Sequence, residues 1–287
     1  MAEGSSGSGS SGSILRKPIW WVAGLVIVAA AVALFLSWRA NRAPPATAHA
    51  PAAAPAPVAE PAVQNPVPAA GGAMQPLPPL NSSDASVDEA LGQLVGKPNA
   101  DSLFRPNMIV RHVVVTVDNL SRKKAAVELR PTKPVAGAFL AAGNDEHASI
   151  DPANYQRYAP YVQTLQMLDS KQLAALYFHY YPLFQQAYQD LGYPNGYFND
   201  RLIETIDNLL ATPEVKGDVA LVRPNVMYQY ADPALESLSA GQKLLLRMGP
   251  DNEAVVKAKL RELRAVLAER TRGNGARVRD SDGATSR

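Results

Sequence analysis

DSKQLAALYFHYYPLFQQAYQDLG, residues 169–192, is the stretch that decides the fold class. Asp169 followed three residues later by Gln172 has the spacing of a helix N-terminal cap. Apolar side chains then recur every three or four residues, which is the period of an amphipathic helix, and Gly192 ends the pattern. Pro182 lies inside the stretch, and because proline has no backbone N–H it predicts an interruption or kink. The stretch therefore predicts a long helix in two parts.

Further helical patterns lie on both sides of this stretch. Ser239 and Gln242 repeat the capping spacing, and Gly249–Pro250 predicts a left-handed glycine cap followed by a helix breaker. Asp151–Pro152 and Asp232–Pro233 each place a capping side chain before a proline at the first helical position. Helices are predicted over about 87–95, from 152, after Asn195, from 233, over 240–248 and over 252–269.

The β structure that the sequence predicts is small. Residues 136–150 indicate a hairpin with its turn at 143–145, and 219–222 and 226–230 indicate two short strands. Residues 108–120 are rich in β-branched side chains, which favours a strand, but their apolar spacing favours a helix, and we expect a helix. The sequence thus predicts one mainly α domain over residues 85–270 with a small β element, and its length allows one hydrophobic core.

The N-terminal part predicts a single transmembrane helix. Residues 18–38 contain no charged side chain, and about 20 apolar residues suffice to cross a bilayer. Trp20, Trp21 and Trp38, the only tryptophans of the chain, lie at its two ends, where indole rings anchor to the headgroup level. We expect these three residues to be membrane-interface anchors.

The charges that flank the span do not decide its orientation. Arg16 and Lys17 precede it and Arg39 and Arg42 follow it, so the positive-inside rule is tied. Because the preceding tail is short, we expect the N-terminus (1–17) in the cytoplasm and the domain in the periplasm, anchored in a bacterial inner membrane. A cleavable signal peptide with its site at Ala46–Ala48 is the alternative.

Two segments outside the predicted domain have biased composition. Residues 39–84 are rich in proline and alanine, and such a linker favours extended geometry at about 3.1 Å per residue. A linker of this length reaches roughly 100 Å when stretched. Residues 271–287 are polar and predict a disordered tail.

Composition excludes several classes of chemistry. The chain has no cysteine, which excludes disulfides, thiol nucleophiles and cysteine zinc sites. Its net charge of +2 comes without a basic stripe, so we expect no nucleic-acid partner. None of the four histidines has a metal-motif spacing, and no phosphate-binding loop or nucleophile elbow occurs. We expect no catalytic residue, metal or cofactor.

Tyrosine is the one residue type with an uneven distribution. Nine of the eleven tyrosines fall between residues 155 and 197. Tyrosine suits partner interfaces, so one interpretation of this region is a partner-binding face. The interpretation that we favour, because the domain has no tryptophan and little phenylalanine, is that these rings fill the core. Arg157 and Arg247 could likewise be structural, bonded to carboxylates such as Asp190. The candidate partner-binding residues are Arg157, Tyr158, Tyr161, Tyr181, Tyr188 and Tyr197.

Three segments resemble a proteobacterial family of unknown function, DUF3014. They read YQRYAP at 155–160, YPLFQQAYQDLGYP at 181–194, and ADPALE at 231–236 continuing to QKLLLRMGPDN at 242–252. The resemblance extends from about Ser102 to Leu267, and the segment RMGPDN is its most specific part. It implies a bacterial envelope protein and no particular activity.

Two functions follow as hypotheses. The first is a scaffold or interaction module, anchored in the inner membrane, that binds an envelope protein or the cell wall. Its basis is the predicted anchor, the reach of the linker and the missing catalytic motif. The second is a membrane-tethered hydrolase or lytic enzyme acting on envelope polymer, which would need a cleft that holds a buried carboxylate of raised pKa.

Overall fold

The computed structural model describes residues 63–67, 76–144 and 147–284, with the backbone alone for 271–284. These residues belong to one compact unit, Glu60–Arg287. The predicted span 18–38, its three tryptophans and the tail 1–17 lie outside the described residues. Within them, none of the helices has both the length and the apolar character to cross a membrane.

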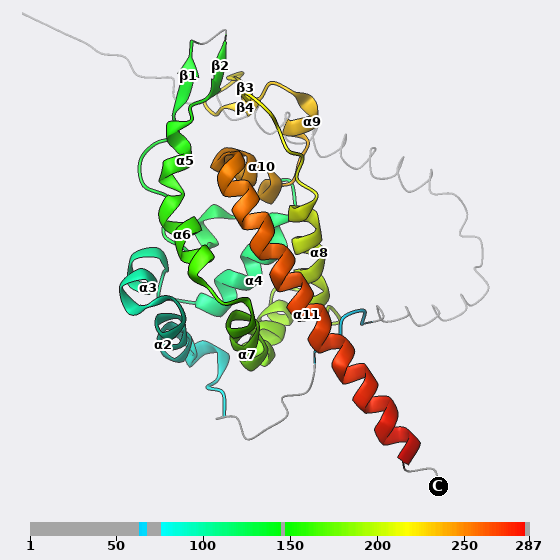
Figure 1. Cartoon of the computed structure of the whole chain (residues 1–287). Helices are drawn as coiled ribbons and strands as arrows, with labels where there is room; N and C mark the ends of the chain where they lie inside the picture. Colours follow the sequence, from blue (N-terminus) through cyan, green and yellow to red (C-terminus); the bar gives the residue numbers. More distant parts are fainter. Residues whose placement is uncertain (1–62, 68–75, 145–146, 285–287) are drawn as a thin grey trace, which may run out of the picture. The chain divides into compact units, whose positions relative to one another are not determined.

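The compact unit is mainly helical, as predicted (Figure 1). Helix α4 lies centrally, and α7, α8, α10 and α2 pack around it. The helices are η1 (Leu80–Ser82), α2 (Asp84–Val95), α3 (Lys97–Leu103), α4 (Ile109–Leu120), η2 (Val127–Leu129), α5 (Ala153–Arg157), α6 (Ala159–Met167), α7 (Ser170–Asp190), α8 (Phe198–Leu210), α9 (Pro233–Glu236), α10 (Ala240–Met248) and α11 (Pro250–Ala284).

The predicted β element is a four-stranded antiparallel sheet at one end of the helices (Figure 1). Its order follows the sequence: β1 (Ala141–Gly143), β2 (Ala148–Ile150), β3 (Ala220–Val222) and β4 (Gln229–Tyr230). The predicted hairpin is confirmed, with Ala141 opposite Ile150 and Gly143 opposite Ala148. β2 then pairs with β3, so the sheet joins segments that lie about 70 residues apart in the chain.

The long helix α7 confirms the predicted cap and corrects the predicted break. The Asp169 carboxylate accepts a hydrogen bond of 2.8 Å from the backbone N–H of Gln172. The helix runs unbroken through Pro182, so the predicted interruption is wrong. Proline inside a helix removes one backbone hydrogen bond and its ring crowds the preceding turn, a cost of about 3 kcal/mol. Tyr181 and Leu183, on either side of it, are both buried in the same core cluster, and their packing outweighs that loss.

Residues 108–120 confirm the helix that their spacing predicts. Ile109, Val110 and Val114 are almost completely buried on one face of α4. The Asp84 carboxylate of α2 caps this helix, since it accepts hydrogen bonds from the backbone N–H groups of Met108 (2.7 Å) and Ile109 (2.9 Å). The helix therefore begins on a cap that is distant in sequence and that local patterns do not show.

The compact unit extends beyond both boundaries that the sequence predicts. Leu80, inside the predicted linker 39–84, is buried in the core. Asn65 donates from its backbone (2.7 Å) and its side chain (2.8 Å) to Asp200 at the start of α8. At the other end, α11 begins at Pro250, two residues before the predicted start, and its backbone continues to Ala284, where the sequence predicts a tail.

The capping residues around α10 are as predicted, with one correction. Ser239 and Gln242 form a reciprocal capping box, and Asp232 caps α9. Gly249 ends α10 at φ +85° and ψ 161°. This is a positive φ but not the left-handed helical conformation that the sequence predicts, because the chain must extend at once into Pro250.

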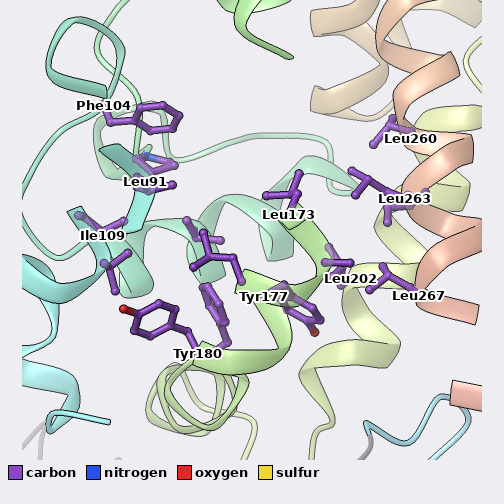
Figure 2. A pocket seen from close by; sticks show the side chains of 17 residues that line it. Leu91, Phe104, Ile109, Leu173, Tyr177, Tyr180, Leu202, Leu260, Leu263 and Leu267 are labelled. Atoms are coloured by element: carbon purple, nitrogen blue, oxygen red, sulfur yellow. The ribbon is translucent and has the colours of Figure 1, made fainter. Parts of the chain in front are cut away.

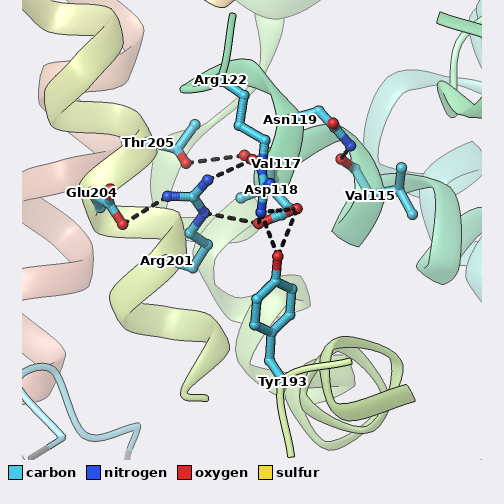
Figure 3. Close-up of polar contacts among 9 residues, drawn as sticks. All are labelled: Val115, Val117, Asp118, Asn119, Arg122, Tyr193, Arg201, Glu204 and Thr205. Carbon is cyan, nitrogen blue, oxygen red and sulfur yellow. Dashed lines mark hydrogen bonds and ion pairs between the residues drawn. The ribbon is translucent and has the colours of Figure 1, made fainter. Parts of the chain in front are cut away.

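A buried carboxylate on α4 connects three parts of the chain (Figure 3). Asp118 is 5% exposed, and its Oδ1 lies 3.1 Å from Nε of Arg201 on α8. Its Oδ2 lies 3.0 Å from a guanidinium nitrogen of Arg122 and accepts from the hydroxyl of Tyr193 at 3.4 Å. The Thr205 hydroxyl donates to the carbonyl of Val117 at 3.0 Å. These bonds fix α8 and the loop after α7 against α4.

This network predicts a large loss of stability in the variant Arg201→Met. Methionine keeps the packing of the stem but leaves a buried charge with one cationic partner fewer, so we expect a loss of about 3 kcal/mol. The matched control is Arg264→Met, whose ion pair with Asp207 is exposed and should be worth less than about 1 kcal/mol. Urea unfolding followed by circular dichroism measures both, and equal losses would contradict the role assigned to Asp118.

Candidate functional site

A groove of about 280 Å³ lies where the sheet meets the C-terminal ends of α5 and α10. Its lining combines aromatic rings, two arginines and an apolar rim, and we call it the arginine groove. The lining residues are Phe139, Arg157, Tyr158, Leu221, Val226, Met227, Tyr228, Gln229, Tyr230 and Arg247.

Arg157 is held in place by hydrogen bonds to neutral groups. It donates to the backbone carbonyls of Ala136 (2.8 Å) and Gly137 (2.7 Å). It also donates to the side-chain oxygen of Asn154 (2.9 Å), which is completely buried. These bonds use three of the five N–H donors of the guanidinium group. Arg157 therefore both braces the 136–140 loop and brings an unneutralised charge to the groove.

The predicted bond from these arginines to carboxylates such as Asp190 is not found. Asp190 forms its ion pair with Arg111, at 3.0 Å. Among the described residues, neither Arg157 nor Arg247 forms an ion pair with a carboxylate. The acidic side chain close to Arg247 is Glu236, which is 2.8 Å from Nζ of Lys243 and is neutralised there.

The two guanidinium groups both act on Tyr158, and Arg247 also acts on Tyr230. Arg247 lies over the ring of Tyr230, with its Cζ 5.9 Å from the ring centroid. Burial raises the pKa of Tyr230 to about 12, and the charge of Arg247 opposes the rise. Burial also raises the pKa of Tyr158, and Arg157 and Arg247 both oppose that rise, so Tyr158 lies within the field of both. The groove thus has a positive potential, with no carboxylate in its lining, that favours an anionic ligand.

The rim of the groove is apolar and open to solvent. Val226 and Met227, in the turn before β4, are 79% and 76% exposed. Beside them, the guanidinium of Arg223 lies 5.4 Å from the ring centroid of Tyr228. Exposed apolar side chains next to arginine and tyrosine are the composition of binding hot spots.

A glycine contact brings the two halves of the groove together. Gly249 lies against the ring of Tyr155, and a Cβ there would come within 2.5 Å of that ring. Asn252 of α11 donates to the backbone carbonyl of Tyr155 at 2.9 Å. The segments 155–160 and 247–252, which lie about 90 residues apart, therefore meet here. This contact sets Arg157 and Tyr158 beside Arg247.

The six predicted partner-binding residues do not form one face. Arg157 and Tyr158 line the groove. Tyr181 and Tyr188 are buried in the core. Tyr197 is half-buried against Tyr181 and accepts a hydrogen bond from the backbone of Val67, and Tyr161 donates to the carbonyl of Lys133. Most of the tyrosine-rich region thus fills or borders the core.

Sequence reasoning missed the residues that complete the groove. Tyr228 and Tyr230 are the two tyrosines outside the 155–197 cluster, and Val226 and Met227 were assigned only to a short strand. The available signal was VMYQY at 226–230, in which apolar or aromatic residues fall on both faces of a strand. Within the part of the chain that the structure describes, no group of three or more His, Asp or Glu side chains is arranged to hold a metal ion.

The comparisons with known proteins agree with the resemblance. The model of the family described as "Protein of unknown function (DUF3014)" matches residues 109–264. This is more than half of the 287 residues, and the chain belongs to this family. No curated protein and no solved structure matches the chain.

The contact of Gly249 with Tyr155 makes a testable prediction. In Gly249→Ala the new methyl group must displace the ring, so we expect a loss of at least about 3 kcal/mol, which combines backbone strain with a steric clash. Gly217→Ala is the matched control, because Gly217 has nearly the same φ (+82°) but no atom within 4 Å of the place that a methyl group would take. We expect it to lose only about 1 kcal/mol. Urea unfolding measures the difference, and equal losses would show that the ring contact is unimportant.

Proposed function

We propose that this member of the DUF3014 family is an interaction module that binds an acidic segment of an envelope protein in the arginine groove. The observation that carries the proposal is the pair of guanidinium groups, Arg157 and Arg247, that share one groove without a carboxylate partner among the described residues. A carboxylate from a partner would supply the missing counter-charge.

The rest of the groove supports a protein partner. Tyr158, Tyr228 and Tyr230 provide rigid aromatic surface next to the charges. Val226 and Met227 offer exposed apolar surface at the rim. An acidic side chain flanked by an apolar one would therefore find complementary groups at both positions, and the buried aromatic contacts would give most of the affinity.

The alternative of a hydrolase acting on envelope polymer has weaker support. Glycoside hydrolases commonly place two carboxylates on either side of the scissile bond. The lining of the arginine groove includes no Asp or Glu. Its chemistry suits the binding of an anion better than acid–base catalysis.

The place of the domain in the cell is part of the proposal. We propose that residues 18–38 anchor the chain in the bacterial inner membrane and that the domain lies in the periplasm. The support is the uncharged sequence of that segment and the tryptophans at its ends. A tether between the span and the compact unit would let the groove search for partners at a distance from the membrane.

Photo-crosslinking in living cells tests the binding function. A photoreactive amino acid at Met227, which is 76% exposed, should give a discrete adduct with one protein. The control position is Met167, an equally accessible methionine at 69% exposure on α6, which should give none. Mass spectrometry should place the crosslink in a segment of the partner that contains Asp or Glu.

A charge variant gives the matching control for this crosslink. Arg247→Gln should weaken the Met227 adduct by about tenfold or more, because a charged contact is lost. Equal adducts from both positions, or an adduct that Arg247→Gln does not weaken, would contradict the proposal.

Cysteine labelling tests the proposed topology. Because the chain has no natural cysteine, single substitutions report one position each. With a membrane-impermeant maleimide and a permeabilised outer membrane, Met167→Cys should be labelled in intact cells, and Ser8→Cys only after lysis. The reverse pattern would place the domain in the cytoplasm. Labelling of neither position before lysis would do the same.

A further inference from the structure

A second cavity, of about 260 Å³, lies among α2, α4, α7, α8 and α11 (Figure 2). All seventeen side chains that line it are apolar or aromatic. The hydroxyl of Tyr177 donates to the side chain of Asn199 (2.9 Å), and that of Tyr180 donates to the carbonyl of Ser86 (3.0 Å). A water molecule in the cavity would therefore find few free partners, and an apolar ligand fits better.

The size of the cavity suits an alkyl chain. An engineered apolar cavity of about 150 Å³ binds benzene, with six carbons, so the same volume per carbon gives about ten carbons here. Figure 2 shows Leu263 and Leu267 of α11 on one side of the cavity and Leu91, Phe104 and Ile109 on the other. The cavity thus extends from α11 across α7 to the side of α2 and α4.

One side of this cavity borders groups that can hold an anion. Phe104 pairs with Thr132, and the backbone N–H of Arg105 donates to the carbonyl of Pro131, a lining residue, at 2.8 Å. The pairing sets these two segments side by side, and Arg105 and Arg130 are the sequence neighbours of the lining residues Phe104 and Pro131. Neither arginine forms an ion pair with a described carboxylate.

Two buried polar atoms, each in a half-buried residue next in sequence to a lining residue, have no hydrogen-bond partner within the described structure. They are Nε of Arg130 and Nδ1 of His112. His112 lies on α4 next to the lining residue Val113, and burial together with the charge of Arg105 lowers its pKa, although Asp84 opposes this. Buried polar groups are normally paired, so two unpaired atoms beside an apolar cavity indicate a ligand with a polar end.

We propose that this cavity binds a free fatty acid of about ten carbons, with its chain among the leucines and its carboxylate beside Arg130 and His112. The carboxylate would accept from Nε–H of Arg130 and, when Nδ1 carries the proton, from His112. The site is independent of the arginine groove, because the two cavities have no lining residue in common.

Calorimetry on the full chain tests the cavity. The chain is reconstituted in phospholipid nanodiscs free of detergent and titrated with decanoate, with empty nanodiscs as the reference for partitioning. Ala174 lines the cavity, so Ala174→Leu fills part of it and should weaken binding by about tenfold or more. Ala175→Leu places the same side chain on the exposed face of α7 and should bind as the native chain does.

A second pair of variants tests the polar end without adding volume. Arg130→Gln should weaken decanoate binding by about tenfold and leave the binding of 1-decanol unchanged, because only the charged ligand uses the guanidinium. Arg261→Gln, at an exposed position of α11, is the control and should alter neither. The proposal would be overturned if titration with decanoate released no more heat from the chain in nanodiscs than from empty nanodiscs. It would also be overturned if both Ala174→Leu and Arg130→Gln bound decanoate as tightly as the native chain does.

Discussion

The buried carboxylate of Asp118 is the constraint on which the arrangement of the helices depends. A charge inside the core is tolerated only when it is paired and hydrogen-bonded. Asp118 meets this condition through Arg201 of α8, Arg122 just after α4 and Tyr193 after α7 (Figure 3). Each partner comes from a different segment, so a shift of any of them would leave the buried carboxylate with one partner fewer. Apolar contacts tolerate sliding, but this set of directed bonds selects one register.

The geometry of the arginine groove depends on the position of α8 against α4. α10 packs onto the pair of α4 and α8 through Gly241, where a Cβ would lie 2.5 Å from Leu209 and 2.9 Å from the carbonyl of Leu120. Gln242 donates to the backbone carbonyl of Asn208 on α8 at 2.9 Å, which fixes α10 along its axis. α10 ends at the groove, and Arg247 in its last turn lines the groove. The position of that charge is therefore set by α4 and α8, although neither helix contributes to the lining.

The features that could be predicted from the sequence are those that interactions between neighbouring residues decide. The Asp169 and Ser239 caps act within three residues, so their patterns are visible and both are confirmed. What failed depends on distant contacts. Core packing on both sides keeps Pro182 inside one helix. Arg157 and Arg247 line the same groove because Gly249 leaves room for the ring of Tyr155, which is distant in sequence. Of the ten residues that line the groove, only Arg157 and Tyr158 were therefore predicted, because a count of tyrosines does not say which rings face the core.

α11 is the element that relates the two cavities. It begins beside the arginine groove, where Asn252 bonds the carbonyl of Tyr155, and it lines the apolar cavity two turns further on from Leu260. Between these points Lys257 and Glu253 form a buried ion pair of 2.8 Å, and Lys257 also donates to the carbonyl of Thr212. Because both members of this pair lie on α11, the pair moves with the helix, and the bond from Lys257 to the carbonyl of Thr212 is the contact that sliding or rotation of this part would break. A shift of α11 at the cavity would therefore have to break the bond to Thr212, and then the bond from Asn252 to Tyr155, before it moved the groove end of the helix.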